Sequence, residues 1–291
     1  MMGPSERTRV TSYLHDGHQF DVVDSGPIDG EVIVLLHGFP QRASSWAKVM
    51  ETLNTAGFRT LAPDQRGYSP GARPRGRRAY RIAKLVGDVA ALIRHIDAGP
   101  VHVVGHDWGA GVGWGLTARH PSLVRSWTSI SVPHPSAFLR SMLSSSQALS
   151  SWYMAFFQLP LVPELLLTRF PKGRDRALGR YGMDRELLDR VAEEIVRDGA
   201  LYGGLGYYRA MPFLGRTPKV RVPTTHVWSD GDTALGRRGA RLTARYVRAP
   251  YELVIMEGVT HWVPDHEPEA LAAIIMARAR SVGNHRATPA Q

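Results

Sequence analysis

The stretch that most constrains the fold of this chain is VHVVGHDWGAGVGWG at residues 101–115. A valine-rich run leads into Gly105, and a second glycine, Gly109, follows three residues after His106. A buried strand that turns sharply into a helix needs glycines on both sides of the turn residue, because side chains there would block the packing of helix on strand. The turn residue is Asp107, whose carboxylate we expect at the carboxyl end of a strand, where α/β sheets bind ligands. The alternative is that Asp107 only caps the helix.

Similar apolar runs, bounded by turn residues, alternate with helical patterns along most of the chain. Strands are expected at 19–26, 31–38, 58–64, 101–106, 123–132, 224–230 and 251–258. Helices are expected at 42–56, 80–96, 108–120, 235–247 and 267–280, with Pro268 suited to the start of the last one. This alternation favours an α/β fold with a mostly parallel sheet covered by helices on both faces.

The alternation is interrupted between residues 134 and 217. That stretch has helical patterns, prolines and aromatic clusters such as SWYMAFFQLPLVPELLL, but no convincing strand. We therefore divide the chain into a first core part at 1–133, a helical lid at 134–217 and a second core part at 218–291. The tail from about residue 282 is expected to be disordered.

Composition excludes several classes of protein. The 291 residues include no cysteine, which excludes disulfides and cysteine-ligated metals. The N-terminal MMGPSERTRV lacks the apolar segment of a signal peptide. No apolar run approaches the roughly 18 residues of a membrane span, so we expect a cytoplasmic protein. The net charge is +10, but its densest source, ARPRGRRAYR at 72–81, is a loop broken by glycine and proline, and we expect no nucleic-acid partner.

Three further segments supply catalytic residue types after predicted strands. LLHGFP ends one strand with His37-Gly38-Phe39-Pro40, a loop placed to offer backbone N–H groups to an oxyanion. WSDGDTAL offers Asp230 and Asp232, and GVTHWVPDHEPE offers His261 after the last strand. Each segment alone is compatible with an ordinary loop. Together with Asp107 they give the chain order of nucleophile, acid and histidine, which is the order of a known hydrolase triad.

On these residues the chain resembles the α/β-hydrolase superfamily over nearly its whole length, and within it the epoxide hydrolases. The other matching segments are DQRGYS at 64–69, GHDWGA at 105–110, GYYR at 206–209, DGD at 230–232 and THW at 260–262. The resemblance implies an eight-stranded, mostly parallel sheet with an inserted helical lid. It also implies a cis peptide bond before Pro40.

A carboxylate nucleophile suits an electrophilic sp³ carbon with a good leaving group, because it is ionised at neutral pH and displaces without a general base. The product is an ester on Asp107 that must be hydrolysed. We expect His261 to take a proton from the attacking water, and Asp232 to orient the imidazole, with Asp230 as a turn residue. The N–H groups of Phe39 and Trp108 are expected to form the oxyanion hole.

Two electrophiles fit this chemistry, an epoxide and an alkyl halide, and only the opening epoxide needs a proton donor. The resemblance implies two lid tyrosines in that role. Tyr153 matches the first, since it lies five residues before Gln158, and Tyr208 matches the second, with Tyr207 as its competitor. Aromatic packing is the alternative for both. Haloalkane dehalogenases share HDWG, but many place asparagine at the position of Phe39 and do not need the tyrosine pair.

We therefore predict an epoxide hydrolase acting on a small-molecule epoxide. A haloalkane dehalogenase is the first alternative, and a non-catalytic small-molecule-binding protein with the same fold is the second. The aromatic lid predicts an apolar pocket. Phe39, Trp108, Phe157 and Trp262 are expected to bind substrate, with core packing an equal alternative for Trp262. The substrate, the stereochemistry and the oligomeric state stay open, with a homodimer as one option.

The remaining motifs are assigned to structure. Asp64 and Arg66 are expected to form a loop pair, and His106 to pack at the turn. No histidine spacing indicates a metal site, and no phosphate loop or dinucleotide fingerprint is present, so we expect neither a metal nor a cofactor.

Overall fold

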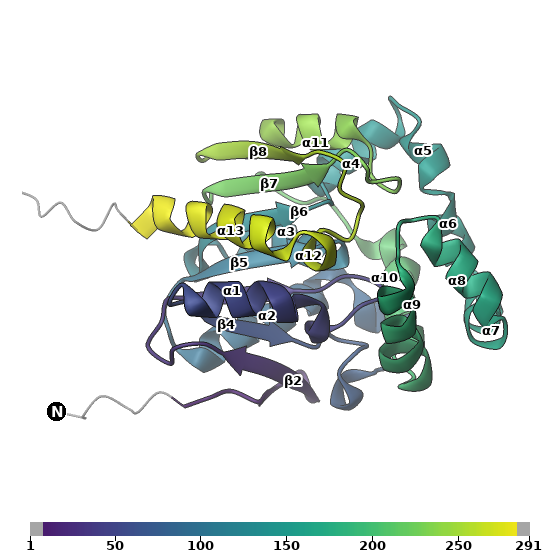
Figure 1. Cartoon of the computed structure of the whole chain (residues 1–291), viewed down its shortest axis with the longest axis horizontal. Helices are drawn as coiled ribbons and strands as arrows, with labels where there is room; N and C mark the ends of the chain where they lie inside the picture. Colours follow the sequence, from purple (N-terminus) through teal and green to yellow (C-terminus); the bar gives the residue numbers. More distant parts are fainter. Residues whose placement is uncertain (1–7, 284–291) are drawn as a thin grey trace, which may run out of the picture.

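The computed structural model describes residues 8–283. At its centre is an eight-stranded sheet with strand order β1-β2-β4-β3-β5-β6-β7-β8 (Figure 1). Strand β2 pairs antiparallel with β1 and β4, and the other pairs are parallel. The strands are β1 (Ser12–His15), β2 (His18–Ser25), β3 (Val32–Leu36), β4 (Arg59–Pro63), β5 (Val101–His106), β6 (Val124–Ile130), β7 (Thr224–Ser229) and β8 (Tyr251–Met256). The predicted α/β class and the eight-stranded sheet are confirmed.

The individual strand predictions missed β1. This strand has four residues, and of these only Tyr13 is buried, so it carries too little apolar pattern to be recognised. The turn that joins it to β2 is Asp16-Gly17, with φ values of 54° and 74°. Asp-Gly is a frequent two-residue hairpin turn, and it was the available sequence signal for this strand.

Helices cover both faces of the sheet because alternate residues of each strand point to opposite sides. Ile33 and Leu35 of β3 pack with α1 (Ala47–Thr55) and α13 (Pro268–Gly283). Val34 and Leu36 pack with α2 (Ile82–Ile96) and α3 (Trp108–Arg119). Figure 1 shows α1 and α13 in front of the sheet and α2 and α3 behind it. Two shorter helices, α11 (Arg237–Thr243) and α12 (Val263–His266), complete the core.

Between β6 and β7 the described chain forms helices and no strand, as predicted for residues 134–217. In Figure 1 these helices gather at one end of the sheet. They are α4 (Pro135–Met142), α5 (Gln147–Ser150), α6 (Trp152–Phe156), α7 (Val162–Arg169), α8 (Pro171–Gly179), α9 (Arg185–Val191) and α10 (Leu201–Arg209). We keep the name lid for residues 134–217.

The C-terminal tail differs from the prediction at its start. Helix α13 continues to Gly283, so it includes the first two residues of the tail predicted to begin at about residue 282. The amphipathic pattern through Ala279 extends the helix by one further turn. The rest of that prediction, 284–291, lies outside the described residues.

The turn between β5 and α3 has the strained geometry that the glycines predicted. Asp107 has φ 50° and ψ −121°, a conformation that residues with a Cβ rarely adopt. A Cβ on Gly109 would overlap the carbonyl oxygen of Leu36, and a Cβ on Gly38 would overlap the Asp107 side chain. The close approach of β3, β5 and α3 therefore holds the strained residue in place.

Two glycines in α3 give a matched test of this packing. We expect Gly109→Ala to lower the free energy of unfolding by about 2–3 kcal/mol, because the new methyl group has no space beside the Leu36 carbonyl. Gly111→Ala, two residues along, meets only the Trp108 ring at 3.7 Å and is expected to change stability by less than about 1 kcal/mol. Urea unfolding of both variants measures the difference, and equal losses would contradict the packing argument.

Candidate active site

Three predicted residues from separate segments meet beyond the carboxyl ends of the strands. Asp107 follows β5, Asp232 follows β7 and His261 follows β8. His261 Nδ1 lies 2.8 Å from Asp232 Oδ2, and His261 Nε2 lies 3.7 Å from Asp107 Oδ2. The imidazole is thus hydrogen-bonded to one carboxylate and faces the other at a distance longer than a hydrogen bond.

Backbone N–H groups fix Asp232, the acid of this group. Its Oδ1 accepts hydrogen bonds from the N–H groups of Ala234 and Leu235 at 2.8 and 2.9 Å, which leaves Oδ2 to His261. Asp230 is exposed and its Oδ1 accepts the N–H of Gly258. The geometry therefore agrees with Asp232 as the partner of His261 and with Asp230 as the turn residue.

The two oxygens of Asp107 have different surroundings. Oδ1 accepts the backbone N–H of Phe39 at 2.8 Å, whereas Oδ2 faces His261. Phe39 precedes a cis peptide bond to Pro40, as expected, in the loop that follows β3. Trp108, the second predicted oxyanion donor, is the first residue of α3. An N–H already bonded to one carboxylate oxygen is positioned for the same oxygen when it becomes an ester carbonyl.

The opposite charges of His261 and Asp107 shift the pKa of both residues. Burial disfavours the charged form of His261, but the attraction of Asp232 and Asp107 outweighs it and raises the pKa of His261 to about 10. Burial also disfavours the Asp107 carboxylate, but His261 and the Phe39 N–H hold its pKa below the usual value. The two groups are therefore an ion pair at neutral pH.

Asp107 lies on the wall of a cavity of about 960 Å³. Trp108, Tyr153 and Tyr208 line the same cavity, and most of the remaining wall is apolar. Burial raises the pKa of both tyrosines well above the usual value, and the negative charge of Asp107 adds to this effect. Both hydroxyls therefore carry their protons at neutral pH.

The structure separates the two adjacent tyrosines of α10. Tyr207 is buried and donates its hydroxyl to the Arg66 carbonyl at 2.8 Å, away from the cavity. Tyr208 lies on the cavity wall, and its carbonyl accepts the Gln158 side-chain amide at 2.5 Å. The rings of Tyr153 and Tyr208 lie 6.1 Å apart. Gln158 thus links the segment that carries Tyr153 to the helix that carries Tyr208.

The four residues expected to bind substrate have different positions. Trp108 lines the cavity, whereas Phe39, Phe157 and Trp262 do not contribute to its wall. Phe39 and Phe157 support it from behind, since both pack edge-on against the Tyr208 ring. Trp262 is buried, donates to the Tyr181 carbonyl and packs against the His261 ring at 5.0 Å. Its position fits the core-packing alternative.

The sequence analysis did not single out helix α4, which forms one side of the cavity. Pro135, Phe138, Leu139 and Met142 all line the cavity from this helix. Their spacing of three, four and seven residues marks one face of a helix and was the available signal.

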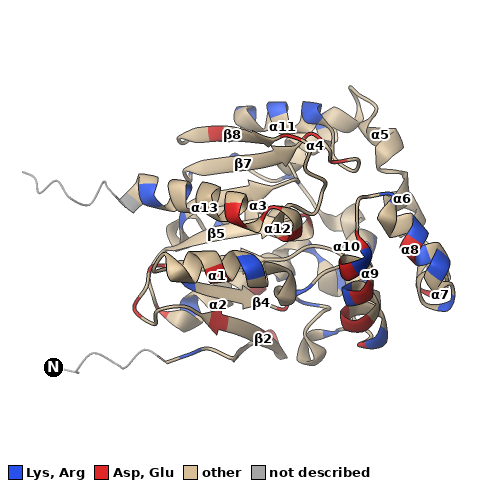
Figure 2. Cartoon of the chain, viewed as in Figure 1, with Lys and Arg blue, Asp and Glu red and all other residues tan. Residues whose placement is uncertain are grey.

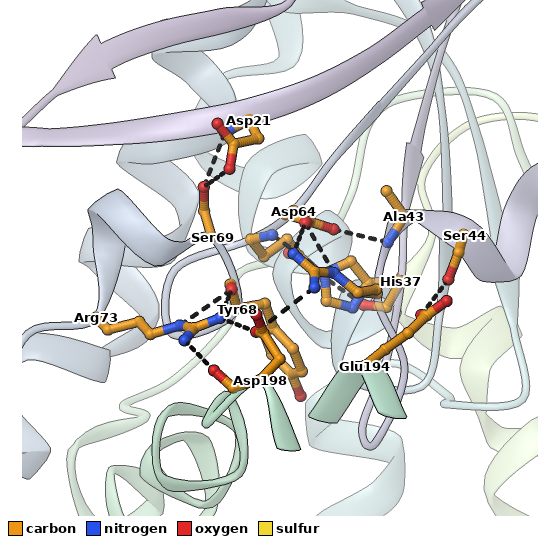
Figure 3. Close-up of polar contacts among 12 residues, drawn as sticks. Asp21, His37, Ala43, Ser44, Asp64, Tyr68, Ser69, Arg73, Glu194 and Asp198 are labelled. Atoms are coloured by element: carbon orange, nitrogen blue, oxygen red, sulfur yellow. Dashed lines mark hydrogen bonds and ion pairs between the residues drawn. The ribbon is translucent and has the colours of Figure 1, made fainter. Parts of the chain in front are cut away.

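The expected pairing of Asp64 with Arg66 is wrong. Asp64 Oδ2 accepts the Arg42 Nε at 2.9 Å, and Figure 3 shows Asp64 also accepting the Ala43 N–H. Arg66 instead makes two hydrogen bonds of 2.7 Å to Asp88 on α2. The side chains of Asp64 and Arg66 point in different directions, so Asp64 pairs with Arg42 and Arg66 pairs with Asp88.

These loops also anchor the lid. Asp198 of the lid contacts Arg73 and Arg42, and Glu194 accepts the Ser44 hydroxyl (Figure 3). Bonds from core loops to the lid restrict how far it can move from the site.

His106 packs at the turn, as expected. Burial lowers its pKa to about 4, so the ring is neutral and its Nε2 donates to the His261 carbonyl at 2.9 Å. Among residues 8–283, no cluster of three or more histidine, aspartate or glutamate side chains is placed to hold a metal ion.

Comparisons with known proteins find relatives that cover most of this chain. Residues 31–268 match the family model described as alpha/beta hydrolase fold. The AB hydrolase superfamily protein YfhM of Bacillus subtilis is 34% identical over 270 residues, which cover 90% of this chain and 94% of that protein. Epoxide hydrolase 3 of Xenopus tropicalis is 33% identical over 273 residues, which cover 89% of this chain and 74% of that protein.

A solved structure is similar over nearly its whole length. The crystal structure of epoxide hydrolase VrEH1 from Vigna radiata superposes with a TM-score of 0.79 at 27% identity, covering 93% of this chain and 97% of that one. This chain belongs to the epoxide hydrolase family of the α/β-hydrolase superfamily. Within the described part of the chain, none of the helices has the length and apolar character needed to cross a bilayer.

The ion pair predicts an unusual histidine titration. We expect His261 to stay protonated until the pH approaches 10, and its pKa to fall in Asp107→Asn because one of the two attracting charges is lost. Side-chain ¹⁵N shifts measure this, with His261→Gln identifying the signal. Since the folded pKa lies above the ordinary value of 6.5, the associated stabilisation is complete below pH 6.5 and is lost as pH rises through 10.

The neutral histidine of the turn is the internal control for this titration. His106 is expected to show no protonation between pH 5.5 and 9, since its pKa is lowered to about 4. A His261 that titrates near its ordinary value in the unmodified protein would contradict the electrostatic account of the site.

Proposed function

We propose that this protein hydrolyses an apolar epoxide to a vicinal diol through a covalent ester on Asp107. The observation that carries the proposal is that one cavity is lined by the Asp107 carboxylate and by two protonated tyrosines, Tyr153 and Tyr208. A carboxylate attacks a strained sp³ carbon, and a tyrosine hydroxyl donates to the oxygen that this attack releases.

In the first step, Asp107 Oδ2 attacks an epoxide carbon while Oδ1 stays hydrogen-bonded to the Phe39 N–H. The new bond joins Oδ2 to carbon, and the carbon–oxygen bond of the ring breaks. Tyr153 or Tyr208 transfers its proton to the leaving oxygen, which becomes a hydroxyl group. Apolar walls suit the carbon skeleton of the substrate and keep the carboxylate poorly solvated.

In the second step, His261 activates water. Esterification removes the negative charge of Asp107, one of the two charges that raise the pKa of His261. The pKa of the imidazolium therefore falls, so it becomes a stronger acid and gives its proton to the tyrosinate, which restores the tyrosine. The neutral imidazole, held by Asp232, then deprotonates a water that attacks the ester carbonyl. The N–H groups of Phe39 and Trp108 stabilise the oxyanion, and one such donor contributes roughly 3 kcal/mol. When the oxyanion collapses, the bond between the Asp107 carbonyl carbon and the diol oxygen breaks. The diol oxygen takes the second proton of the water, and Asp107 and His261 return to their charged forms.

A halide leaving group would need N–H donors but no acid. The two protonated tyrosines beside Asp107 therefore favour an epoxide over an alkyl halide. The ester-hydrolysing pair of His261 and Asp232 has no use in a protein that only binds a ligand. The cytoplasmic location and the homodimer remain predictions.

One turnover in ¹⁸O-water tests the ester directly. With enzyme in excess over an aryl epoxide, we expect the first diol to be unlabelled, because its new oxygen comes from Asp107. The label should then appear in the peptide that contains Asp107. Mass spectrometry of diol and peptide measures both. His261→Gln should accumulate the ester, and Asp107→Asn should form none.

Other outcomes redirect the assignment. Label that enters the first diol would show direct water attack and overturn the ester route. If no diol forms from any epoxide offered and halide is released from alkyl halides instead, the same nucleophile serves a dehalogenase.

The adjacent tyrosines allow a matched test of the proton donors. We expect Tyr153→Phe and Tyr208→Phe each to lower kcat/KM by about tenfold or more, and the double variant by about 10³-fold. Tyr207→Phe is the control: it removes an equally buried hydroxyl that bonds to the Arg66 carbonyl, so it is expected to affect stability but not turnover. Equal kinetic losses in Tyr207→Phe and Tyr208→Phe would contradict these roles.

A further inference from the structure

The exposed apolar side chains of this protein are concentrated on the lid. Of the fourteen large apolar side chains that are exposed among residues 8–283, ten lie between residues 139 and 170. They are Leu139, Leu143, Leu149, Trp152, Leu159, Leu161, Val162, Leu165, Leu166 and Phe170. Single exposed apolar residues are ordinary, but a concentration of this kind marks a surface that contacts something other than water.

Cations flank these residues without acidic partners. Arg140, Arg169, Lys172, Arg176 and Arg180 are exposed, and none of them lies within ion-pair distance of a described carboxylate. The two acids of residues 134–183 are already engaged, Glu164 by Arg209 and Asp175 by Arg174 and Arg185. Figure 2 shows blue segments on α7 and α8 at the outer edge of the lid. We call these ten apolar residues and five cations the lid patch.

We propose that the lid patch docks on the surface of an anionic lipid bilayer. Apolar side chains beside unpaired cations are the combination that binds such a surface, because the former enter the headgroup region and the latter pair with acidic headgroups. A second copy of this chain fits less well. It would bring a like-charged patch and a molecule of net charge +10 against five unpaired cations.

The position of the cavity gives this contact a use. Leu139, Arg140 and Leu143 belong to the lid patch and also line the cavity that contains Asp107. These three residues therefore connect the exposed part of α4 with the cavity wall. An apolar epoxide dissolved in the bilayer can enter from a docked lid without crossing water. The docking does not depend on the proposed function, since it is measured without turnover.

Vesicle flotation with the full chain tests the proposal. We expect binding to vesicles of phosphatidylcholine with about one-third phosphatidylserine, and little binding to phosphatidylcholine alone. Salt at about 0.5 M should release the protein. Trp152 is 61% exposed, so its fluorescence should be quenched by brominated lipid, and this quenching should be absent in Trp152→Phe.

Variants locate the contact. We expect Arg169→Glu/Lys172→Glu/Arg176→Glu to weaken binding by at least about tenfold, because each reversed charge removes an attraction. Leu161→Ser/Leu165→Ser should weaken it through the apolar part of the patch. The control is Lys219→Glu/Arg221→Glu/Arg248→Glu, which makes the same change in net charge in a separate basic cavity beside the end of α3. This control should bind as the unmodified chain does.

Three results would overturn the proposal. The first is no binding of the unmodified chain to the anionic vesicles. The second is an equal loss of vesicle binding in the lid variants and the control variant. The third is a dimer that dissociates in Leu161→Ser/Leu165→Ser, in a protein that does not bind vesicles. The last result would assign the patch to a second copy of the chain. Circular dichroism melting of each variant excludes unfolding as the cause of lost binding.

Discussion

The chemistry of this protein depends on a backbone contact in which α3 begins directly against the end of β3. At Gly109 there is no space for a side chain beside the Leu36 carbonyl, and at Gly38 there is none beside the Asp107 side chain. This packing holds Asp107 at φ 50°, a conformation that its own side chain disfavours. The carboxylate therefore projects from the sheet into the wall of the cavity, with Oδ1 on the Phe39 N–H and Oδ2 facing His261.

Electrostatics then couple the two halves of the proposed reaction. One imidazole lies between two carboxylates, and its proton affinity reflects both charges. Converting Asp107 to a neutral ester removes one of these charges, so the first step itself lowers the affinity of His261 for its proton. A histidine that is charged while the nucleophile is free, and neutral once the ester has formed, meets the different needs of the two steps.

The lid provides what the sheet cannot, which is an apolar wall that brings the Tyr153 and Tyr208 side chains into the cavity that Asp107 lines. The lid is joined to the core by polar contacts, including Arg190 with Asp265 of α12 and Asp198 with Arg73 of a core loop. The lid also presents an outer surface that its own fold does not bury. Inner and outer faces meet at Leu139 and Leu143, which are exposed and yet line the cavity.

The sequence by itself determined the α/β class, the strained turn at Asp107 and the order of Asp107, Asp232 and His261. Glycine spacing, apolar periodicity and residue types are local signals, and backbone sterics act locally too. Only the tertiary structure decided that Tyr208 and not Tyr207 lines the cavity, that Trp262 packs behind His261, and that Arg66 pairs with Asp88 rather than Asp64. The pairing of β1 with β2 was also seen only in the structure, because apart from the Asp16-Gly17 turn the short strand has little apolar pattern. The direction of a side chain, and its pairing with a residue far away in the sequence, depend on how helices and strands pack together. A local sequence pattern does not predict that packing.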